Sequence, residues 1–205
     1  MPKPHISILN LGIGNLYSLA NSLEKLGASV TINKPGESLD DAAAIILPGV
    51  GAYRDAINNL KKTKDTFPDY VRSGKHFLGI CLGMQLFFTE SHEDGLHKGL
   101  NLLKGPVTKL PSNVRTPHIG WNTLHNIGAH PLFKGIDDNS YVYYAHSYAP
   151  EPIDPEIIIA TSTYGRIYPA AVAKNRIYGT QFHPEKSGKV GMRILQNFLQ
   201  LITNP

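Results

Sequence analysis

Residues 76–88 have the sequence HFLGICLGMQLFF. His76 to Ile80 form a short apolar run that predicts a strand, and Leu82 to Phe88 predict a helix that begins directly after it. Gly79 and Gly83 leave room for a sharp turn between the two, which has the form of a nucleophile elbow. The residue at the apex of such a turn projects from the end of its strand. This stretch therefore predicts a strand-turn-helix unit with a reactive side chain at the turn.

Apolar strands and amphipathic helices alternate through the first half of the chain. Besides residues 76–88, the predicted elements are strands at 5–9, 29–32 and 43–47 and helices at 16–26, 53–60 and 67–72. Strands that alternate with helices predict a parallel sheet with helices on both faces. Ligands bind beyond the carboxyl ends of the strands in such sheets. Pro48 to Gly51 and Cys81 both follow strand ends, so we expect them to share one rim of the sheet.

The second half predicts further strands and one long helix. The strands are expected at residues 141–145, 157–161, 170–174 and 177–182, and the helix at 189–202. The predicted fold class is therefore α/β, with a mostly parallel central sheet and a smaller antiparallel sheet in the second half. A length of 205 residues fits a single domain over residues 1–205.

Composition narrows the possible partners. The net charge is only +4, from 20 Lys and Arg against 16 Asp and Glu, so no nucleic-acid partner is expected. The one dense basic run, KKTK at residues 61–64, is interpreted as a solvated loop. A single cysteine forbids an intramolecular disulfide and fits a reducing compartment. No signal peptide or membrane-spanning run is present, so we expect a cytoplasmic protein without a membrane partner.

Cys81 is the first candidate for chemistry. It would lie at the N-terminus of a helix, where the positive end of the helix dipole favours a thiolate. Backbone N–H groups at that terminus could also hold a developing oxyanion. A buried structural cysteine between a core strand and a helix is the alternative interpretation.

QFHPE, residues 181–185, is the second candidate. Pro184 cannot donate a ladder hydrogen bond, so the strand should end near it. His183 could then take a thiol proton while the Glu185 carboxylate orients the ring. A surface histidine and a solvated glutamate are the alternative.

PGVG, residues 48–51, is the third candidate. Glycines at a strand end let backbone amides approach a ligand closely, so this loop could supply a second oxyanion donor. By itself the loop also fits an ordinary strand-to-helix turn.

Together these segments resemble the class I, or triad, glutamine amidotransferases, whose fold is flavodoxin-like. GICLGMQ at residues 79–85 and QFHPE at 181–185 carry that resemblance in the expected order and spacing. Further segments resemble one branch of the family, the glutaminase subunit of imidazole glycerol phosphate synthase. They are GIGNL at residues 12–16, PGVGAY at 48–53, HIGWN at 118–122, HSY at 146–148 and EKSG at 185–188. The match runs from Asn10 to Phe198. It departs from the branch where Asn10 and Leu11 replace an acidic and an aromatic residue, and where Ile119 replaces a methionine.

The resemblance implies a mechanism and a set of site residues. Cys81 would attack the side-chain amide of L-glutamine, with His183 as proton carrier and Glu185 as the group that holds its ring. Ammonia and glutamate would be the products. The implied oxyanion hole is Gly49, Val50, Gly51 and Leu82, and the implied substrate-binding residues are Gly51, Gln85, His146, Ser147 and Tyr148. No metal and no cofactor are implied.

The resemblance also implies a partner, because free ammonia becomes unreactive ammonium in bulk water. That partner would be a separate (βα)8-barrel cyclase subunit, HisF, in a heterodimer that makes imidazole glycerol phosphate and aminoimidazole carboxamide ribotide in histidine biosynthesis. The expected interface residues are Asn10, Trp121, Tyr143 and Lys186. Tyr141 and Tyr144 are expected in the core instead.

Three alternatives remain at this point. An α/β-hydrolase also uses an elbow of this form, but its acid precedes the histidine, whereas Glu185 follows His183. A sister glutaminase subunit would serve anthranilate, aminodeoxychorismate or guanylate synthesis, but HIGWN and PGVGAY favour the histidine branch. A non-catalytic regulatory subunit of the same fold would usually have lost Cys81, His183 or Glu185.

Overall fold

The computed structural model describes residues 3–12, 16–60, 63 and 66–203. The first half contains β1 (His5–Leu9), α1 (Leu16–Lys25), β2 (Ser29–Asn33), β3 (Ala44–Gly49), α2 (Tyr53–Asn59), α3 (Phe67–Arg72), β4 (His76–Cys81), α4 (Leu82–Leu86), β5 (Glu90–Ser91) and β6 (His97–Lys98). The second half contains β7 (Pro106–Lys109), β8 (His118–Thr123), η3 (Pro131–Phe133), β9 (Tyr141–His146), β10 (Tyr148–Pro150), η4 (Pro155–Ile157), β11 (Ile158–Tyr164), β12 (Arg166–Lys174), β13 (Ile177–Thr180), η5 (Pro184–Lys186) and α5 (Gly188–Thr203).

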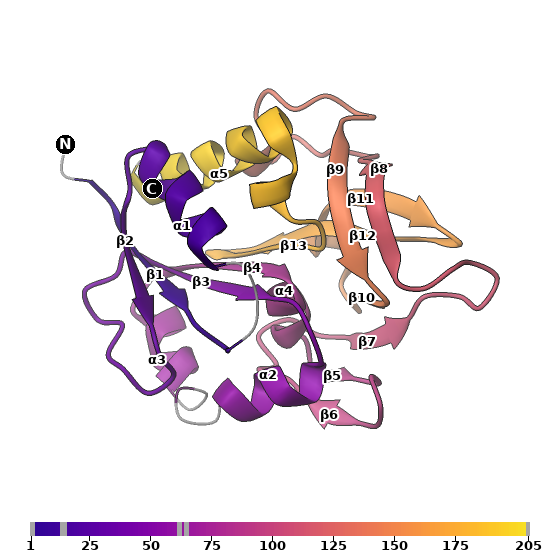
Figure 1. Cartoon of the computed structure of the whole chain (residues 1–205), viewed down its shortest axis with the longest axis horizontal. Coiled ribbons are helices and arrows are strands. Elements are labelled where there is room, and N and C mark those ends of the chain that lie inside the picture. Colours follow the sequence, from indigo (N-terminus) through magenta and orange to yellow (C-terminus); the bar gives the residue numbers. More distant parts are fainter. Residues whose placement is uncertain (1–2, 13–15, 61–62, 64–65, 204–205) are drawn as a thin grey trace.

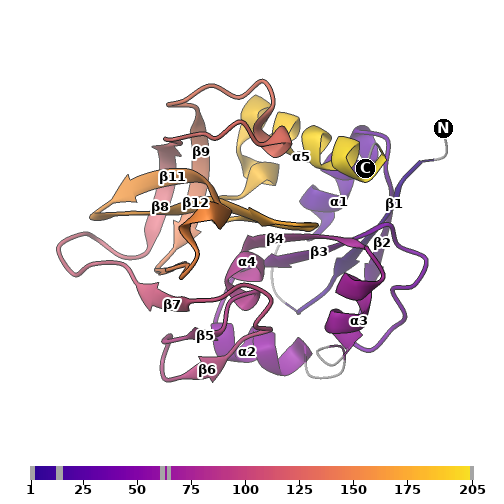
Figure 2. The same cartoon turned by 180° about the vertical axis from the view of Figure 1, so that it is seen from behind.

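A seven-stranded sheet forms the centre of the molecule, in the order β11-β12-β13-β4-β3-β1-β2. The strands from β13 to β2 run parallel, and β12 and β11 add an antiparallel edge. Helices α1 and α5 lie on one face, and α2 and α3 lie on the other (Figures 1 and 2). The predicted α/β class with a mostly parallel sheet is confirmed.

Strand β3 shows why its sequence is a continuous apolar run. Ile46 belongs to the hydrophobic cluster that α1 and α5 complete. Ile45 and Leu47 point to the opposite face and join the cluster with α2, α3 and α4. A strand covered on both faces has no solvent side, so all of its positions are apolar. The register then pairs Gly49 at the end of β3 with Cys81 at the end of β4, which places both at one rim as predicted.

Two smaller sheets lie beside the central one, and they contain antiparallel pairs together with one parallel pair, β5 with β7. Strands β10, β7, β5 and β6 form a four-stranded sheet, and β8 pairs with β9. The β8–β9 register sets Trp121 opposite Tyr143 and His118 opposite His146. In this way HIGWN lies beside the strand that ends at the HSY segment.

The core position predicted for Tyr141 is wrong, because its side chain is 60% exposed. Alternate residues of β9 point to opposite sides, and Val142 and Tyr144 take the buried side. Tyr141 therefore lies on the open face of the β8–β9 pair. The core position predicted for Tyr144 is confirmed.

Two sequence features lie outside the described residues, namely residues 13–15 of the predicted GIGN turn and the lysines of the KKTK run. Thr63, between those lysines, is described and is buried. Within the described part of the chain, the helices are all too short or too polar to cross a membrane.

Candidate active site

Cys81 lies at the predicted elbow, as the last residue of β4 and the residue before α4. Its backbone has φ 55° and ψ −111°, a conformation that residues other than glycine rarely adopt. Such strain persists only where the surrounding structure enforces it, and it gathers at functional sites. The side chain is buried, and its sulfur lies 3.7 Å from the carbonyl oxygen of Ala145 on β9. The strained turn thus points the thiol toward a second sheet.

Close packing behind the elbow explains the glycines beside it. A Cβ on Gly83 would lie 1.7 Å from the carbonyl oxygen of Leu47, and one on Gly79 would lie 2.5 Å from the nitrogen of Met84. Helix α4 therefore rests directly on the backbones of β3 and β4. Because a side chain at either position would separate these elements, the two glycines set the position of Cys81.

His183 and Glu185 form a buried pair beside β9. Nδ1 of His183 lies 2.9 Å from Oε1 of Glu185, and both side chains are almost fully buried. An ionised carboxylate only accepts hydrogen bonds, so Nδ1 carries the hydrogen. The backbone N–H of His183 donates to the carbonyl oxygen of Tyr143, and the Ser187 hydroxyl donates to the carbonyl oxygen of His183. The loop after β13 is thereby fastened to β9.

Two opposing effects act on the pKa of His183. Burial lowers it, whereas the Cys81 thiolate and the Glu185 carboxylate raise it, and the balance brings the pKa to about 10. The Nε2 atom is buried and makes no hydrogen bond of ordinary geometry within the described residues, so it remains available to Cys81. At neutral pH the ring is therefore an imidazolium beside the Cys81 sulfur.

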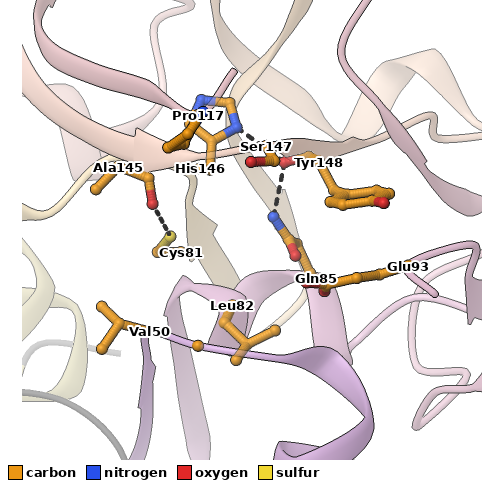
Figure 3. A pocket seen from close by; sticks show the side chains of 11 residues that line it. Val50, Cys81, Leu82, Gln85, Glu93, Pro117, Ala145, His146, Ser147 and Tyr148 are labelled. Carbon is orange, nitrogen blue, oxygen red and sulfur yellow. Dashed lines mark hydrogen bonds between the residues drawn. The ribbon is translucent and has the colours of Figure 1, made fainter.

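A pocket of about 190 Å³ opens in front of Cys81. Figure 3 shows Val50 and Leu82 on one side of the sulfur and the segment from Ala145 to Tyr148 on the other. The lining residues are Val50, Gly51, Cys81, Leu82, Gln85, Glu93, Pro117, Ala145, His146, Ser147 and Tyr148. The expected oxyanion and substrate residues thus line one pocket, except Gly49, which is the partner of Cys81 in the pairing of β3 with β4. The volume suits one small molecule.

The profile of the class I glutamine amidotransferase family matches residues 7–201. This chain belongs to the class I glutamine amidotransferase family. It is also 44% identical to imidazole glycerol phosphate synthase subunit HisH of Geobacillus kaustophilus, with 97% of each chain covered. It is 45% identical to the HisH subunit of Methanosarcina barkeri, with 96% of this chain and 98% of the relative covered. The resemblance to this family and to its histidine branch is confirmed.

Solved structures agree with this class I amidotransferase fold. PurLQS of Thermotoga maritima has a TM-score of 0.77 at 22% identity, covering 97% of this chain and 99% of that one. A glutamine amidotransferase of the same organism has a TM-score of 0.69 at 16% identity, covering 98% and 99%. At such identities the likeness concerns the fold alone.

The pocket of this amidotransferase also holds a residue that sequence analysis missed. Glu93 lines it beside Gln85 (Figure 3), and its carboxylate accepts a hydrogen bond from the backbone N–H of Tyr53 at 3.1 Å. Burial raises the pKa of Glu93, which the hydrogen bond from Tyr53 partly offsets. Glu93 belongs to none of the recognised motifs, so only the folded chain identifies it. Gln85 is itself buried and donates from Nε2 to the carbonyl oxygen of Tyr148 at 2.8 Å.

Two of the expected interface residues of the amidotransferase, Trp121 and Tyr143, lie on the open face of β8 and β9, and Lys186 reaches Tyr143 from η5. Trp121 is 56% exposed and packs edge-on against Tyr143, with ring centroids 6.0 Å apart. The Nζ atom of Lys186 lies 5.7 Å from the centroid of the Tyr143 ring. Asn10 follows β1 and accepts a hydrogen bond from the backbone N–H of Gly12. Among the described residues, no group of three His, Cys, Asp or Glu side chains could hold a metal ion.

The pKa of His183 gives a pH-dependent prediction for this amidotransferase. Folding favours the charged ring, so its contribution to stability is complete below about pH 6.5 and is lost as the pH rises through about 10. In Cys81→Ala the sulfur is absent, so only Glu185 remains to raise the pKa of His183 against the lowering effect of burial. We therefore expect the titration midpoint of His183 to fall, as measured by NMR of the histidine rings between pH 5 and 11. His76 lies at the other end of β4 and should keep its midpoint. An unmoved midpoint for His183 would show that the sulfur does not control this ring.

Proposed function

We propose that this chain hydrolyses L-glutamine with Cys81 as nucleophile and delivers the ammonia to a separate cyclase subunit of imidazole glycerol phosphate synthase. One observation carries the proposal: a strained Cys81 faces an amino-acid-sized pocket while coupled to a buried His183–Glu185 pair. The HisH names of the relatives support the choice of pathway. We also propose one domain over residues 1–205, supported by a family match that spans residues 7–201.

The chemistry divides between two states of His183. The Cys81 thiolate attacks the carboxamide carbon, and the imidazolium gives its proton to the nitrogen as the carbon–nitrogen bond breaks. Ammonia leaves and a glutamyl thioester remains. Neutral His183 then takes a proton from water, whose oxygen attacks the thioester carbon, and glutamate departs as the thiolate is restored. Throughout, Glu185 keeps the ring in the tautomer that presents Nε2 to the sulfur.

Backbone amides stabilise the oxyanion formed in each attack. The amide of Leu82 begins α4 beside the sulfur, and the segment from Gly49 to Gly51 ends β3 next to it. Both segments are held by the close packing of α4 on β3. Donors fixed in this way need no rearrangement at the transition state, and losing one typically costs about 10²–10³-fold in rate.

The rest of the pocket suits the amino-acid end of glutamine. Nε2 of Gln85 is occupied by the carbonyl oxygen of Tyr148, so Oε1 of Gln85 is left to accept a hydrogen bond from a ligand. The Glu93 carboxylate adds a negative charge on the same wall. Together they suit an α-ammonium group. The backbone of Ser147 lies across the pocket and is proposed to hold the α-carboxylate.

Glu93→Gln tests this arrangement because glutamine keeps an oxygen for the backbone N–H of Tyr53 and loses only the charge. We expect the KM for glutamine to rise by about tenfold or more, since a hydrogen bond to a charged group contributes roughly 1.5–3 kcal/mol. We expect a much smaller change in kcat. Steady-state glutamate release measures both. Glu156→Gln, at an exposed position in η4, is the matched control. Equal KM values for Glu93→Gln and the control would remove Glu93 from the substrate site.

The open face of β8 and β9 is the proposed docking surface for the cyclase. Ile119 and Trp121 from β8 and Tyr141 from β9 are all more than half exposed on it. Aromatic residues and a cation beside them are typical of interfaces with strong central contacts. The same strand, β9, continues into the pocket at His146. A partner here would thus lie close to the place where ammonia forms.

Glutamate release by the purified chain, alone and with a cyclase subunit plus its nucleotide substrate, tests the proposal. Turnover stimulated by the partner and abolished by Cys81→Ala is expected. Trp121→Ala should weaken that stimulation while leaving turnover without a partner unchanged. If the cyclase does not change the rate of glutamate release, the chain is still a glutaminase but the proposed pathway is overturned. A wild-type chain that releases no glutamate under either condition would overturn the glutaminase itself.

A further inference from the structure

Gln181 belongs to the QFHPE segment, yet the mechanism above gives it no task. Its side chain is fully buried between Cys81 and Gln85. Nε2 of Gln181 lies 3.6 Å from the sulfur of Cys81, and its Oε1 lies 3.1 Å from Nε2 of Gln85. A buried amide is costly unless its polar atoms are paired, and both ends of this one are paired with site residues.

The orientation of these amides follows from one fixed acceptor, the carbonyl oxygen of Tyr148. A carbonyl oxygen only accepts hydrogen bonds, so the atom of Gln85 that lies 2.8 Å from it must be the NH₂ group. That NH₂ group also faces Gln181, which must therefore present its oxygen there. The NH₂ group of Gln181 is then left to face Cys81. Nδ1 of His146 lies 2.8 Å from the same carbonyl and must likewise carry its hydrogen.

We propose that Gln181 is a positioning residue that donates a hydrogen bond to the Cys81 sulfur and at the same time holds Gln85 in its substrate-binding orientation. This inference rests on the proposed glutaminase function. It adds a buried link between the nucleophile and the group proposed to bind the amino-acid end of glutamine. The link runs from Cys81 through Gln181 and Gln85 to the carbonyl oxygen of Tyr148, which His146 also fixes.

The donor at the sulfur favours one state of Cys81. An N–H group can only donate, so its hydrogen bond gains strength when the thiol becomes a thiolate. The neutral thiol has a different partner, because its hydrogen can point to the carbonyl oxygen of Ala145 at 3.7 Å. Gln181 thus joins the His183 imidazolium in stabilising the thiolate, and both side chains are buried.

The charged and titratable groups around Cys81 come from several elements. His183 and Glu185 belong to the loop and η5, and their electrostatic coupling to the sulfur has been described. His146 ends β9, and its burial lowers its pKa to about 3, so this ring stays neutral beside the pocket. Glu93 lies on the wall near Gln85. The side chain of Gln181 does not titrate, so it can act on the sulfur at every pH.

Alkylation by iodoacetamide tests the inference without requiring glutaminase activity. Cys81 is the single cysteine of the chain, so alkylation followed by mass spectrometry reports on this sulfur alone. In Gln181→Met, which keeps the length of the side chain and removes the amide, the rate should fall about tenfold at pH values well below the wild-type midpoint, where the thiolate fraction drops about tenfold for each unit by which the midpoint rises. The pH of half-maximal rate should rise by about one unit, as expected for the loss of one hydrogen bond to a charged group.

Two control variants separate this effect from simple loss of packing. Gln85→Met should raise the KM for glutamine and move the alkylation midpoint less than Gln181→Met does, since the donor to the sulfur is still present. Asn197→Leu removes a buried amide that donates to the carbonyl oxygens of Leu132 and Lys134, so it should lower stability without moving the midpoint. Gln181→Met should also raise the KM, because Gln85 loses its neighbour.

An alkylation midpoint in Gln181→Met equal to that of the wild type would overturn the inference. A wild-type chain that is alkylated normally but releases no glutamate would overturn the proposed function instead, so the two failures are distinct. If Gln181→Met does not fold, the side-chain amide resonances of Gln181 in the wild-type chain provide the same test. The chemical shifts of these resonances should change with pH around the same midpoint as the alkylation rate. Chemical shifts that stay constant through that pH range would contradict a hydrogen bond from Gln181 to the Cys81 sulfur.

Discussion

Replacing His183 with glutamine is expected to lower glutamine turnover by about 10⁴-fold or more, since loss of the proton carrier of a catalytic triad has effects of this size. The NH₂ group of glutamine can still donate to the Glu185 carboxylate, so the buried acid keeps a partner. What is lost is the charge beside the Cys81 sulfur and the group that carries the proton to ammonia. Turnover with saturating glutamine, nucleotide and cyclase measures the effect.

Controls for this variant come from the same chain. His92→Gln changes a half-exposed histidine that contacts Glu90, and it should retain full turnover. The double variant His183→Gln with Glu185→Gln should be little worse than His183→Gln alone, because residues that act as a unit are not additive. If the second change multiplied the loss by a further large factor, Glu185 would act independently of the ring.

Replacing Gly83 with alanine is expected to destabilise the fold by about 3 kcal/mol or more and to lower turnover by about 10²-fold or more. The added Cβ would lie 1.7 Å from the carbonyl oxygen of Leu47 and 2.6 Å from its carbon. These are backbone atoms of β3, a central strand that cannot move aside. Helix α4 must therefore shift away from β3, and Cys81 shifts with it. Denaturant unfolding and glutamate release together measure the two effects.

Gly128→Ala is the matched control for this substitution. A Cβ there would have only an ordinary contact, 3.7 Å from the carbonyl oxygen of Ile159, and the position is exposed. Its stability should stay within about 0.5 kcal/mol of the wild type. Should Gly83→Ala behave like this control, the close approach of α4 to β3 would not be what places the nucleophile.

The local features of the site were predictable because short-range sterics enforce them. The elbow needs glycine at residue 79 because a Cβ there would lie 2.5 Å from the nearby nitrogen of Met84, and the positive φ of Cys81 agrees with a sharp turn. Pro184 cannot donate a ladder hydrogen bond, so no strand runs through it, and His183 and Glu185 lie together where η5 begins after β13. A strand buried on both faces is apolar throughout, as β3 is.

The exposure of Tyr141 and the position of Glu93 were not predictable in this way. The residues that follow Tyr141 are apolar and aromatic, as they would be after a buried tyrosine. The side chain is exposed only because β9 pairs with β8 and turns this face of the strand outward. Glu93 reaches the pocket because its segment folds back to the start of α2, where it accepts the backbone N–H of Tyr53. Contacts between segments 40 residues apart leave no local pattern.

Neighbouring residues in the chain are enough to specify the alternation of strands and helices, the elbow at Cys81 and the short loop that joins His183 to Glu185. Each of these depends on the steric and hydrogen-bonding properties of a few adjacent residues. The packing of distant segments specifies which side of β9 faces outward, that Glu93 joins the pocket, and that Gln181 lies between the sulfur and Gln85. No short stretch of sequence contains this information, since a buried polar atom takes its partner from whatever the fold places beside it.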